Sequence, residues 1–272
     1  MGSEIAWYLL SYDQLCRLND MVYRQFACRL FYLPEGISKR GDFIMRQIYI
    51  RLLFLVGGLF LYALGIIVTL HANIGYAPWE VFHVGLAKTI GISIGTASII
   101  TGLFIGIITV FLGEKLGFGT VLNMVLIGVF LDIILKLNIV PVANDFVTGA
   151  IMLIVGLFII SLATYFYIGS AFGAGPRDSL MVALTRKSGL SVGVCRGIIE
   201  LLAVVIGWKL GGMLGIGTIL SAFTIGFCVQ TTFALLKFDA TAVKHETLDQ
   251  TYRNFFSKKK DQLCTEKVSK NY

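Results

Sequence analysis

Gly75-Tyr76-Ala77-Pro78-Trp79-Glu80 returns 98 residues later as Gly173-Ala174-Gly175-Pro176-Arg177-Asp178. The two copies align without a gap, and 24 of the 74 residues from Leu55 to Gly128 are identical to the residue 98 positions further on. Most of these identities are Gly, Pro, Ser or aliphatic residues, which determine the path of the backbone and its packing. The sequence therefore predicts two halves with the same fold.

The composition predicts that both halves lie in a membrane. Hydrophobic residues make up 56% of the 272 residues and charged residues 14%, whereas soluble domains have about 25% charged residues. A helix that crosses a bilayer needs roughly 20 apolar residues in a row. We expect an all-α polytopic membrane protein with about six transmembrane helices. The expected spans are 51–71, 94–112, 118–135, 147–168, 192–210 and 216–236.

The number of spans in each half predicts a 3+3 inverted repeat. Three is an odd number, so the second half must enter the membrane from the opposite side. With the N-terminus in the cytoplasm, eight basic residues near the spans lie inside and three lie outside, in agreement with the positive-inside rule. We therefore expect a multi-pass protein with both termini in the cytoplasm. The eight are Arg46, Arg51, Lys115, Arg177, Arg186, Lys187, Arg196 and Lys237, and the three are Lys88, Lys136 and Lys209.

A distinctive connector joins the first and second spans of each half. It runs from a Gly-x-x-Pro motif, through an acidic residue, to a Gly-x-Ser-x-Gly motif. Proline suits the first turn of a helix, and an acidic residue beside it complements the helix dipole. We therefore predict short helices at 78–90 and 176–188, which either lie at the membrane interface or enter the membrane as re-entrant segments, and serine N-caps on the spans that follow. The motif residues are Gly75, Pro78 and Ser93 in the first half and Gly173, Pro176 and Ser191 in the second.

Four segments are expected along the chain. Residues 1–44 form either an amphipathic segment or a non-native leader, because Met45 stands directly before the first span as a translation start would. Residues 45–140 form the first membrane repeat and residues 141–238 the second. Residues 239–272 form a basic cytoplasmic tail.

The connectors resemble those of the YczE branch of the YczE/YyaS/YitT group of bacterial integral membrane proteins. The resemblance is carried by Asn73–His83, Gly91–Thr96 and Gly173–Leu180, and it extends from about Met45 to Leu236. It implies a location in a bacterial cytoplasmic membrane. It also implies a role of the kind discussed for that group, whose members have been described as transporter-like and linked to lipopeptide antibiotic production.

The architecture and the resemblance give two expectations about function. The first is a small transporter or permease that moves an unidentified solute by alternating access. The second is a non-transporting accessory or regulatory protein that supports the production or export of a secondary metabolite such as a lipopeptide. Both roles imply the lipid bilayer as a partner, and a second copy of the chain or another membrane protein is a further candidate.

Glu200 and Arg196 are the candidate site residues deepest in a predicted span. Glu200 lies eight residues into its span, which is roughly 12 Å at about 1.5 Å per residue. Arg196 is four residues earlier on the same helical face. An ionisable group at this depth is costly and is therefore a functional candidate. Two interpretations remain open: a structural ion pair, with Arg196 reaching toward the cytoplasmic edge, or a site linked to substrate or protons.

The connectors supply five further candidates. Arg177 and Asp178 begin the second short helix on the cytoplasmic side. They are either a positive-inside arginine with an acid that complements the dipole, or an element that binds an anion at free backbone N–H groups. Trp79, Glu80 and His83 are the equivalents near the outer side. We expect Trp79 to be an interfacial anchor and His83 to be either structural or a titrating group.

Other classes of function are not indicated. Gly91–Gly95 matches the letters of a nucleophile turn, but it precedes a membrane helix, so no catalytic residues and no enzyme are expected. The five cysteines are scattered, and neither a metal site nor a cofactor is expected. Much of the net charge of +7 lies in the tail and next to spans, where it suits anionic lipid rather than nucleic acid.

Asp132 lies near the end of a predicted span, and we expect its side chain to lie among the lipid headgroups.

Overall fold

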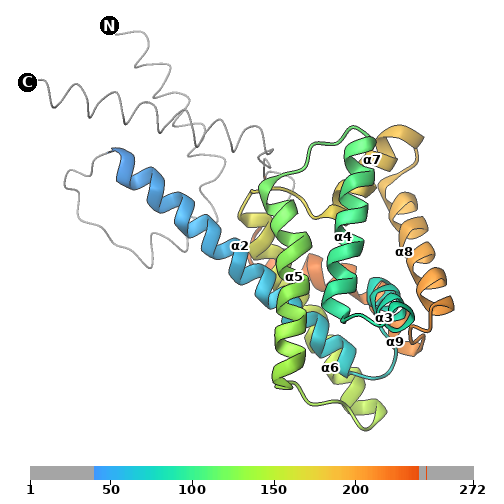
Figure 1. Cartoon of the computed structure of the whole chain (residues 1–272). Coiled ribbons are helices and arrows are strands. Elements are labelled where there is room, and N and C mark those ends of the chain that lie inside the picture. Colours follow the sequence, from blue (N-terminus) through green and yellow to red (C-terminus); the bar gives the residue numbers. More distant parts are fainter. Residues whose placement is uncertain (1–39, 239–242, 244–272) are drawn as a thin grey trace, which may run out of the picture.

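The computed structural model describes residues 40–238 and residue 243, and this part of the chain folds into eight α-helices (Figure 1). No strand occurs among these residues, so the predicted all-α class is confirmed. The predicted leader and basic tail lie almost entirely outside the described residues. The helices are α2 (Arg40–His71), α3 (Pro78–Ile90), α4 (Ile94–Phe111), α5 (Phe118–Leu137), α6 (Phe146–Gly169), α7 (Pro176–Ser188), α8 (Val192–Lys209) and α9 (Ile216–Leu235).

Among the described residues, five helices are long and apolar enough to cross a membrane, namely α2, α4, α5, α6 and α9. Large apolar side chains on these helices are exposed: Leu53 by 72%, Phe111 by 83% and Phe223 by 82%. Such surfaces suit contact with lipid hydrocarbon. The protein is therefore a polytopic membrane protein.

The sixth predicted span, α8, differs from the other five in its charge. It has 18 residues, as many as α4, but it carries Arg196, Glu200 and Lys209. Charged side chains within a span are costly and usually face protein or water. The crossing of the membrane by α8 therefore stays a prediction.

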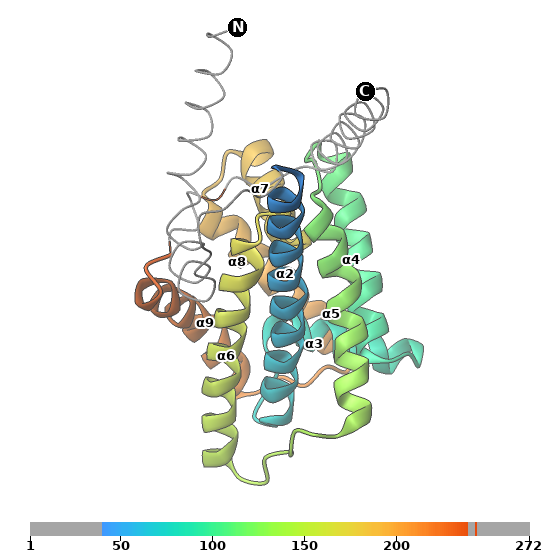
Figure 2. The same cartoon turned by 90° about the vertical axis from the view of Figure 1, so that its left-hand side faces the viewer.

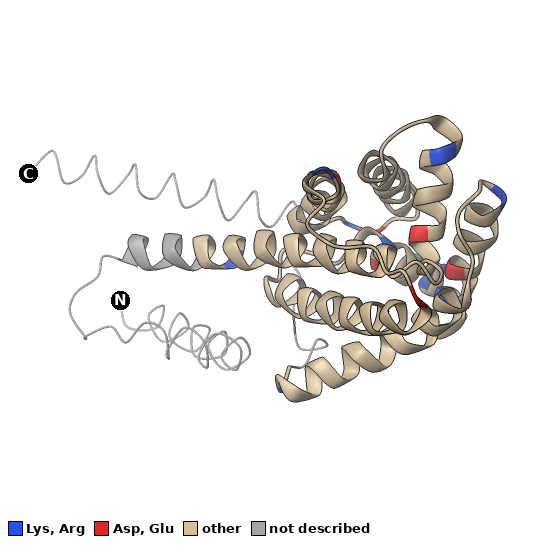
Figure 3. Ribbon diagram, turned by 90° about the horizontal axis from the view of Figure 1, so that it is seen from below, with Lys and Arg blue, Asp and Glu red and all other residues tan. Residues whose placement is uncertain are grey.

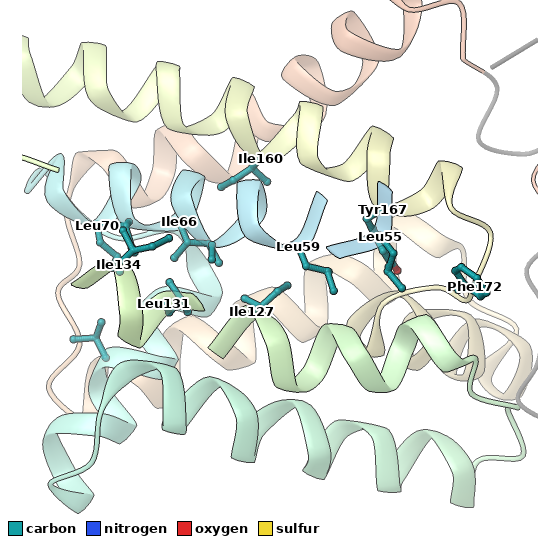
Figure 4. Packing of buried hydrophobic residues seen from close by; sticks show 13 residues of the cluster. Leu55, Leu59, Ile66, Leu70, Ile127, Leu131, Ile134, Ile160, Tyr167 and Phe172 are labelled. Carbon is teal, nitrogen blue, oxygen red and sulfur yellow. The ribbon is translucent and has the colours of Figure 1, made fainter. Parts of the chain in front are cut away.

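The core forms where α2 packs along α5 and α6 (Figure 4). Small residues bring α2 and α6 close together: a Cβ on Gly58 would lie 3.0 Å from Phe166 Cβ, and one on Gly65 would lie 2.7 Å from Ile160 Cγ1. Residue numbers rise along α2 as those of its partners fall along α6, so the helices are antiparallel (Figure 2). They are also the equivalent first helices of the two halves.

The backbone repeats at the same offset as the sequence. Four pairs of residues 98 apart have a left-handed backbone, which is the conformation that turns the chain at equivalent places. Each short helix starts at its proline, and each following helix is capped by the side chain of its serine. The pairs and their φ angles are Asn73 (54°) and Ala171 (59°), Gly75 (123°) and Gly173 (135°), Gly91 (75°) and Gly189 (70°), and Gly113 (89°) and Gly211 (90°).

Each connector is bound by the last helix of the other half. The N–H of Gly217 donates to the carbonyl of Ile74 at 2.8 Å, and the N–H of Gly119 donates to the carbonyl of Phe172 at 2.8 Å. These two hydrogen bonds join residues that are equivalent in the repeat. The two halves are therefore interlocked by the same contact made twice.

Only glycine fits at the centre of these contacts. A Cβ on Gly75 would lie 2.7 Å from Gly215 Cα, and a Cβ on Gly173 would lie 2.8 Å from Gly117 Cα. Real Cβ atoms do not approach backbone this closely, and the positive φ of both connector glycines would strain any other residue as well.

The two halves differ in how their last two helices pack. In the first half, α4 and α5 are in contact, and a Cβ on Gly95 would overlap the carbonyl oxygen of Gly128. Asp132 accepts hydrogen bonds from the hydroxyl of Ser93 (2.5 Å) and the N–H of Gly95 (2.9 Å). It therefore holds the start of α4 against α5.

In the second half, the equivalent glycines face open space. Neither Gly193 on α8 nor Gly226 on α9 would have an atom within 4 Å of an added Cβ. The main contacts of α8 are instead with α3 and α7, and those of α9 are with α6. One half is thus closed between its last two helices while the other is open.

This difference predicts opposite effects of the same substitution at equivalent positions. Gly95→Ala should push α4 away from α5, and overpacking of this kind costs about 1–3 kcal/mol. Gly193→Ala should not lower stability, because the new methyl group meets nothing and alanine favours a helix by up to about 1 kcal/mol. Thermal unfolding of the purified variants in detergent checks this. Equal losses of stability for both variants would contradict the observed packing.

Candidate functional site

The candidate site lies where the two short helices meet. The guanidinium carbon of Arg177, at the start of α7, lies 4.5 Å from the centre of the Trp79 ring, at the start of α3. A cation over an aromatic face is attracted by the ring quadrupole. Arg177 and Trp79 are 98 residues apart, so they are equivalent positions of the two halves. The site therefore lies where equivalent residues of the two halves contact each other.

This contact differs from the expected placement of both residues. Trp79 was expected as an anchor at the outer interface and Arg177 near the cytoplasmic side. The structure instead brings their helix N-termini together, and both α3 and α7 contact α4 and α8. The physical reason is that each connector turns into the bundle at its left-handed glycine, Gly75 or Gly173.

An acidic residue lies in the first turn of each short helix. Glu80 follows Pro78 in α3, and Asp178 follows Pro176 in α7. A helix N-terminus carries a partial positive charge, which stabilises an acidic group within the first turn. Two positive helix ends and two carboxyl groups are thus gathered at one place.

The third acidic residue of the site comes from α8. Arg196 Nε donates to Glu200 Oε1 at 2.9 Å, so the predicted pair is formed. The side chain of Arg196 is 53% exposed and that of Glu200 is 23% exposed. The electrostatic neighbours of Asp178 include Arg196, Arg177 and Glu200. The structure therefore brings the α8 pair and the connector candidates into one cluster, and Figure 3 shows several acidic residues, in red, among the helices of the bundle.

The two connector carboxyls differ in burial. Glu80 is 6% exposed, whereas Asp178 is exposed. Desolvation is nevertheless the main cause that raises the pKa of Asp178, and Arg196 and Arg177 oppose it. Desolvation also raises the pKa of Glu80, against the attraction of Arg177. Both residues belong to short helices outside the five apolar spans. Asp178 thus combines a costly ionised form with access to solvent.

His83 lies deeper in α3 and is 1% exposed. Its ring centre lies 6.4 Å from that of Trp79 and 6.3 Å from that of Phe82. Desolvation first, and then Arg177, lower the pKa of His83 well below its ordinary value. Its Nε2 has no hydrogen-bond partner within the described residues. His83 is therefore a neutral side chain packed behind the site.

Two tyrosines complete the site, and the sequence analysis missed both. Tyr167 on α6 is 3% exposed, and its hydroxyl has no hydrogen-bond partner in the part of the chain that the structure describes. Tyr62 on α2 is influenced electrostatically by Arg177, Glu80 and Asp178. The sequence did contain a signal for them, because each is a polar residue in an apolar span and differs from its equivalent in the other half. Tyr167 corresponds to Thr69, and Tyr62 corresponds to Ile160.

The described residues contain no cluster of three or more His, Cys, Asp and Glu side chains arranged to hold a metal ion. The free cysteines Cys195 and Cys228 are both buried. What the site offers is three carboxyl groups, two guanidinium groups and two phenols at the junction of two helix N-termini. Such a set can bind a charged solute or exchange a proton.

The comparisons with known proteins agree with the resemblance seen in the connectors. The chain is 36% identical over 188 residues to the uncharacterized membrane protein YczE of Bacillus subtilis (strain 168), covering 68% of this chain and 86% of that protein. It is 27% identical over 183 residues to the uncharacterized protein YyaS of the same organism, covering 66% and 90%. An uncharacterized protein of Haemophilus influenzae is 34% identical over 159 residues, covering 58% and 72%.

No solved structure matches the chain. The model of one protein family matches residues 49–233, which include every helix of the repeat and all the candidate site residues. The predicted YczE-like branch is confirmed by the similarity to YczE and YyaS. The chain belongs to the family of unknown function DUF6198.

Proposed function

We propose that this protein is a small membrane transporter that moves a charged solute by alternating access. The observation that carries the proposal is the contact between the side chains of Arg177 and Trp79, which stand at equivalent positions in the first turns of the two short helices. In transporters built from inverted repeats, the solute site lies at the interface of the repeats and uses such broken helices. The antiparallel packing of the equivalent helices α2 and α6 supports an inverted arrangement of the halves.

The difference between the halves supports a second conformation. If two halves have the same fold, exchanging their conformations gives a second state of similar energy. In that state α8 would close on α9 through Gly193 and Gly226, and α4 would separate from α5. The closed half already has the glycine contact that this requires, between Gly95 and Gly128. Access to the central site would then change sides.

The orientation in the membrane is part of the proposal. We place both termini in the cytoplasm of a bacterial cell and count α8 as the sixth span. The start of α8 then lies inside, close to Lys187, and its end lies outside, at Lys209. This assignment satisfies the positive-inside rule.

The alternative is a non-transporting accessory or regulatory protein, for example one that supports lipopeptide production or export. The exposed apolar faces of α8 and α9 favour it, because another membrane protein could cover them. Neither candidate function assigns a bond-breaking reaction to the site.

Glu200→Gln should abolish solute flux if the charge pair with Arg196 shapes the site. The assay is uptake of a panel of small organic anions and cations by proteoliposomes. Glu114→Gln is the matched control, because Glu114 forms the other Arg–Glu pair of the described residues, with Arg186 at 3.1 Å, and lies away from the centre. Flux that survives Glu200→Gln unchanged would contradict a role of the pair. No flux for any solute, together with a co-purifying partner, would favour the accessory role.

Gly193→Ala should block the exchange of conformations without lowering stability, because its methyl group would prevent α8 from closing on α9. Spin labels at Leu190 and Leu235 report on the open pair of helices, and labels at the equivalent Ile92 and Leu137 report on the closed pair. Pulsed electron spin resonance of the wild type should show a minor short distance for the first pair, which Gly193→Ala removes. A single unchanged distance in both proteins would count against alternating access.

The topology can be tested with single cysteines. A membrane-impermeant maleimide added to whole cells should label a cysteine placed at Lys88 or Lys209, but not one placed at Lys115 or Lys187. Because Lys187 and Lys209 flank α8, these two positions decide whether that helix crosses the membrane. Labelling of both or neither would show that α8 does not cross.

A further inference from the structure

The three carboxyl groups of the site are not equivalent. Glu200 accepts a hydrogen bond from the guanidinium of Arg196, with Nε and Oε1 2.9 Å apart, so it is already paired. Glu80 is 6% exposed, so water reaches it poorly. Asp178 is exposed and forms no hydrogen bond or ion pair with another side chain within the described residues. Of the three, only Asp178 is both unpaired and accessible.

The carboxyl group of Asp178 and a buried phenol approach the same side of Gly175. The position that a Cβ of Gly175 would occupy lies 3.2 Å from Asp178 Oδ2 and 3.2 Å from the hydroxyl oxygen of Tyr167. The hydroxyl of Tyr167 is buried and has no partner among the described residues. A buried polar group without a partner points to an occupant such as water, an ion or a proton. A side chain at position 175 would crowd both oxygens, because its Cβ would lie in tighter than ordinary contact with each of them.

We propose that Asp178 binds and releases a proton during the conformational exchange, with the Tyr167 hydroxyl as its partner across Gly175. The proton moves from hydronium in water to a carboxylate oxygen of Asp178 and later returns to water, so no other reactant is needed. This inference deepens the proposed function, and its link to transport rests on that function. The proton site itself can be tested without measuring solute flux.

The surroundings of Asp178 favour a change of protonation between conformations. Helices α8, α2 and α6 contribute charged or titratable groups that interact with Asp178. Helix α4 has none, and Asp132 of α5 is engaged at the start of α4. Arg196, which stabilises the ionised form, lies on α8, the helix that would move. Movement of α8 would therefore change the affinity of Asp178 for a proton. The groups that interact with it electrostatically are Arg177, Arg196, Glu200, Tyr62 and Tyr167.

Infrared spectroscopy of the full chain in lipid bilayers tests the site directly. Above the ordinary pKa of aspartate, the wild type should still show the C=O band of a protonated carboxyl group, because desolvation raises the pKa of Asp178. Asp178→Asn should remove the part of this band that Asp178 contributes, while any part from the buried Glu80 stays. Asp145→Asn is the matched control, because Asp145 is exposed, caps α6 and can be replaced there by asparagine, so the band should stay.

A second variant keeps the test decisive if Asp178→Asn does not fold. Tyr167→Phe retains Asp178 and the ring but removes the hydroxyl, so it should shift the position of the band and the pH at which it disappears. Absence of the band in the wild type, or a band of unchanged intensity in Asp178→Asn, would overturn the proposal. An unchanged band in Tyr167→Phe would overturn the role of the tyrosine.

Stability gives an independent measurement. The pKa of Asp178 is raised from its ordinary value of 3.8, so between that pH and the raised pKa the folded protein holds more protons than the unfolded chain. Stability must therefore fall as pH rises through this window. The melting temperature of Asp178→Asn relative to the wild type should rise with pH across the window, while Asp145→Asn shows no such rise. A flat difference would contradict the proton site, whereas a rise without any solute flux would contradict transport alone.

Discussion

The structure depends on hydrogen bonds that each half supplies to the irregular backbone of the other. Between the first and second helices of each half the chain leaves helical geometry, and its carbonyl and N–H groups need partners because lipid supplies none. Gly217 and Gly119 donate to Ile74 and Phe172, and the hydroxyl of Thr120 donates to the carbonyl of Ala174. These bonds require the backbones to touch, which only glycine permits. The short helices can therefore start inside the bundle rather than at its surface.

The backbone follows the repeat, but the side chains of the candidate site do not. Glu200 and Arg196 stand where the first half has Gly102 and Ser98, and Tyr167 stands where it has Thr69. The residues that build the fold are thus shared by the halves, whereas the Arg196–Glu200 pair and Tyr167 are supplied by the second half alone. This division is expected of a protein in which symmetry creates the architecture and departures from symmetry create the site.

Much of the fold could be predicted because the signals are local. The short helices begin at Pro78 and Pro176, as predicted from proline and the neighbouring acid, and Ser93 caps its helix through the N–H of Thr96. Apolar length identified five of the spans, while the charges of α8 leave that helix ambiguous.

The candidate site was only partly predictable because its geometry depends on distant contacts. Six of the seven candidate residues could be found as charged or titratable groups in apolar surroundings. Their meeting could not, since the stacking of Arg177 on Trp79 depends on how deeply both connectors turn into the bundle. Tyr167 was missed because a tyrosine near the end of a span is ordinary until its hydroxyl is known to lack a partner. The roles of Asp132 and of the open α8–α9 pair likewise follow from packing between helices, which periodicity does not encode.

The two halves differ in the charges on their last two helices, and this difference couples the proposed conformational exchange to the occupancy of the site. The closed half holds its last two helices with a glycine contact and an aspartate cap, so opening it costs hydrogen bonds. The open half carries Arg196 and Glu200 on the helix that must move. Closing α8 on α9 would bring this pair into a drier place, where an unbalanced charge is costly. A proton or a charged solute at the neighbouring Asp178 alters that balance, so occupancy of the site and the position of α8 must influence each other in both directions.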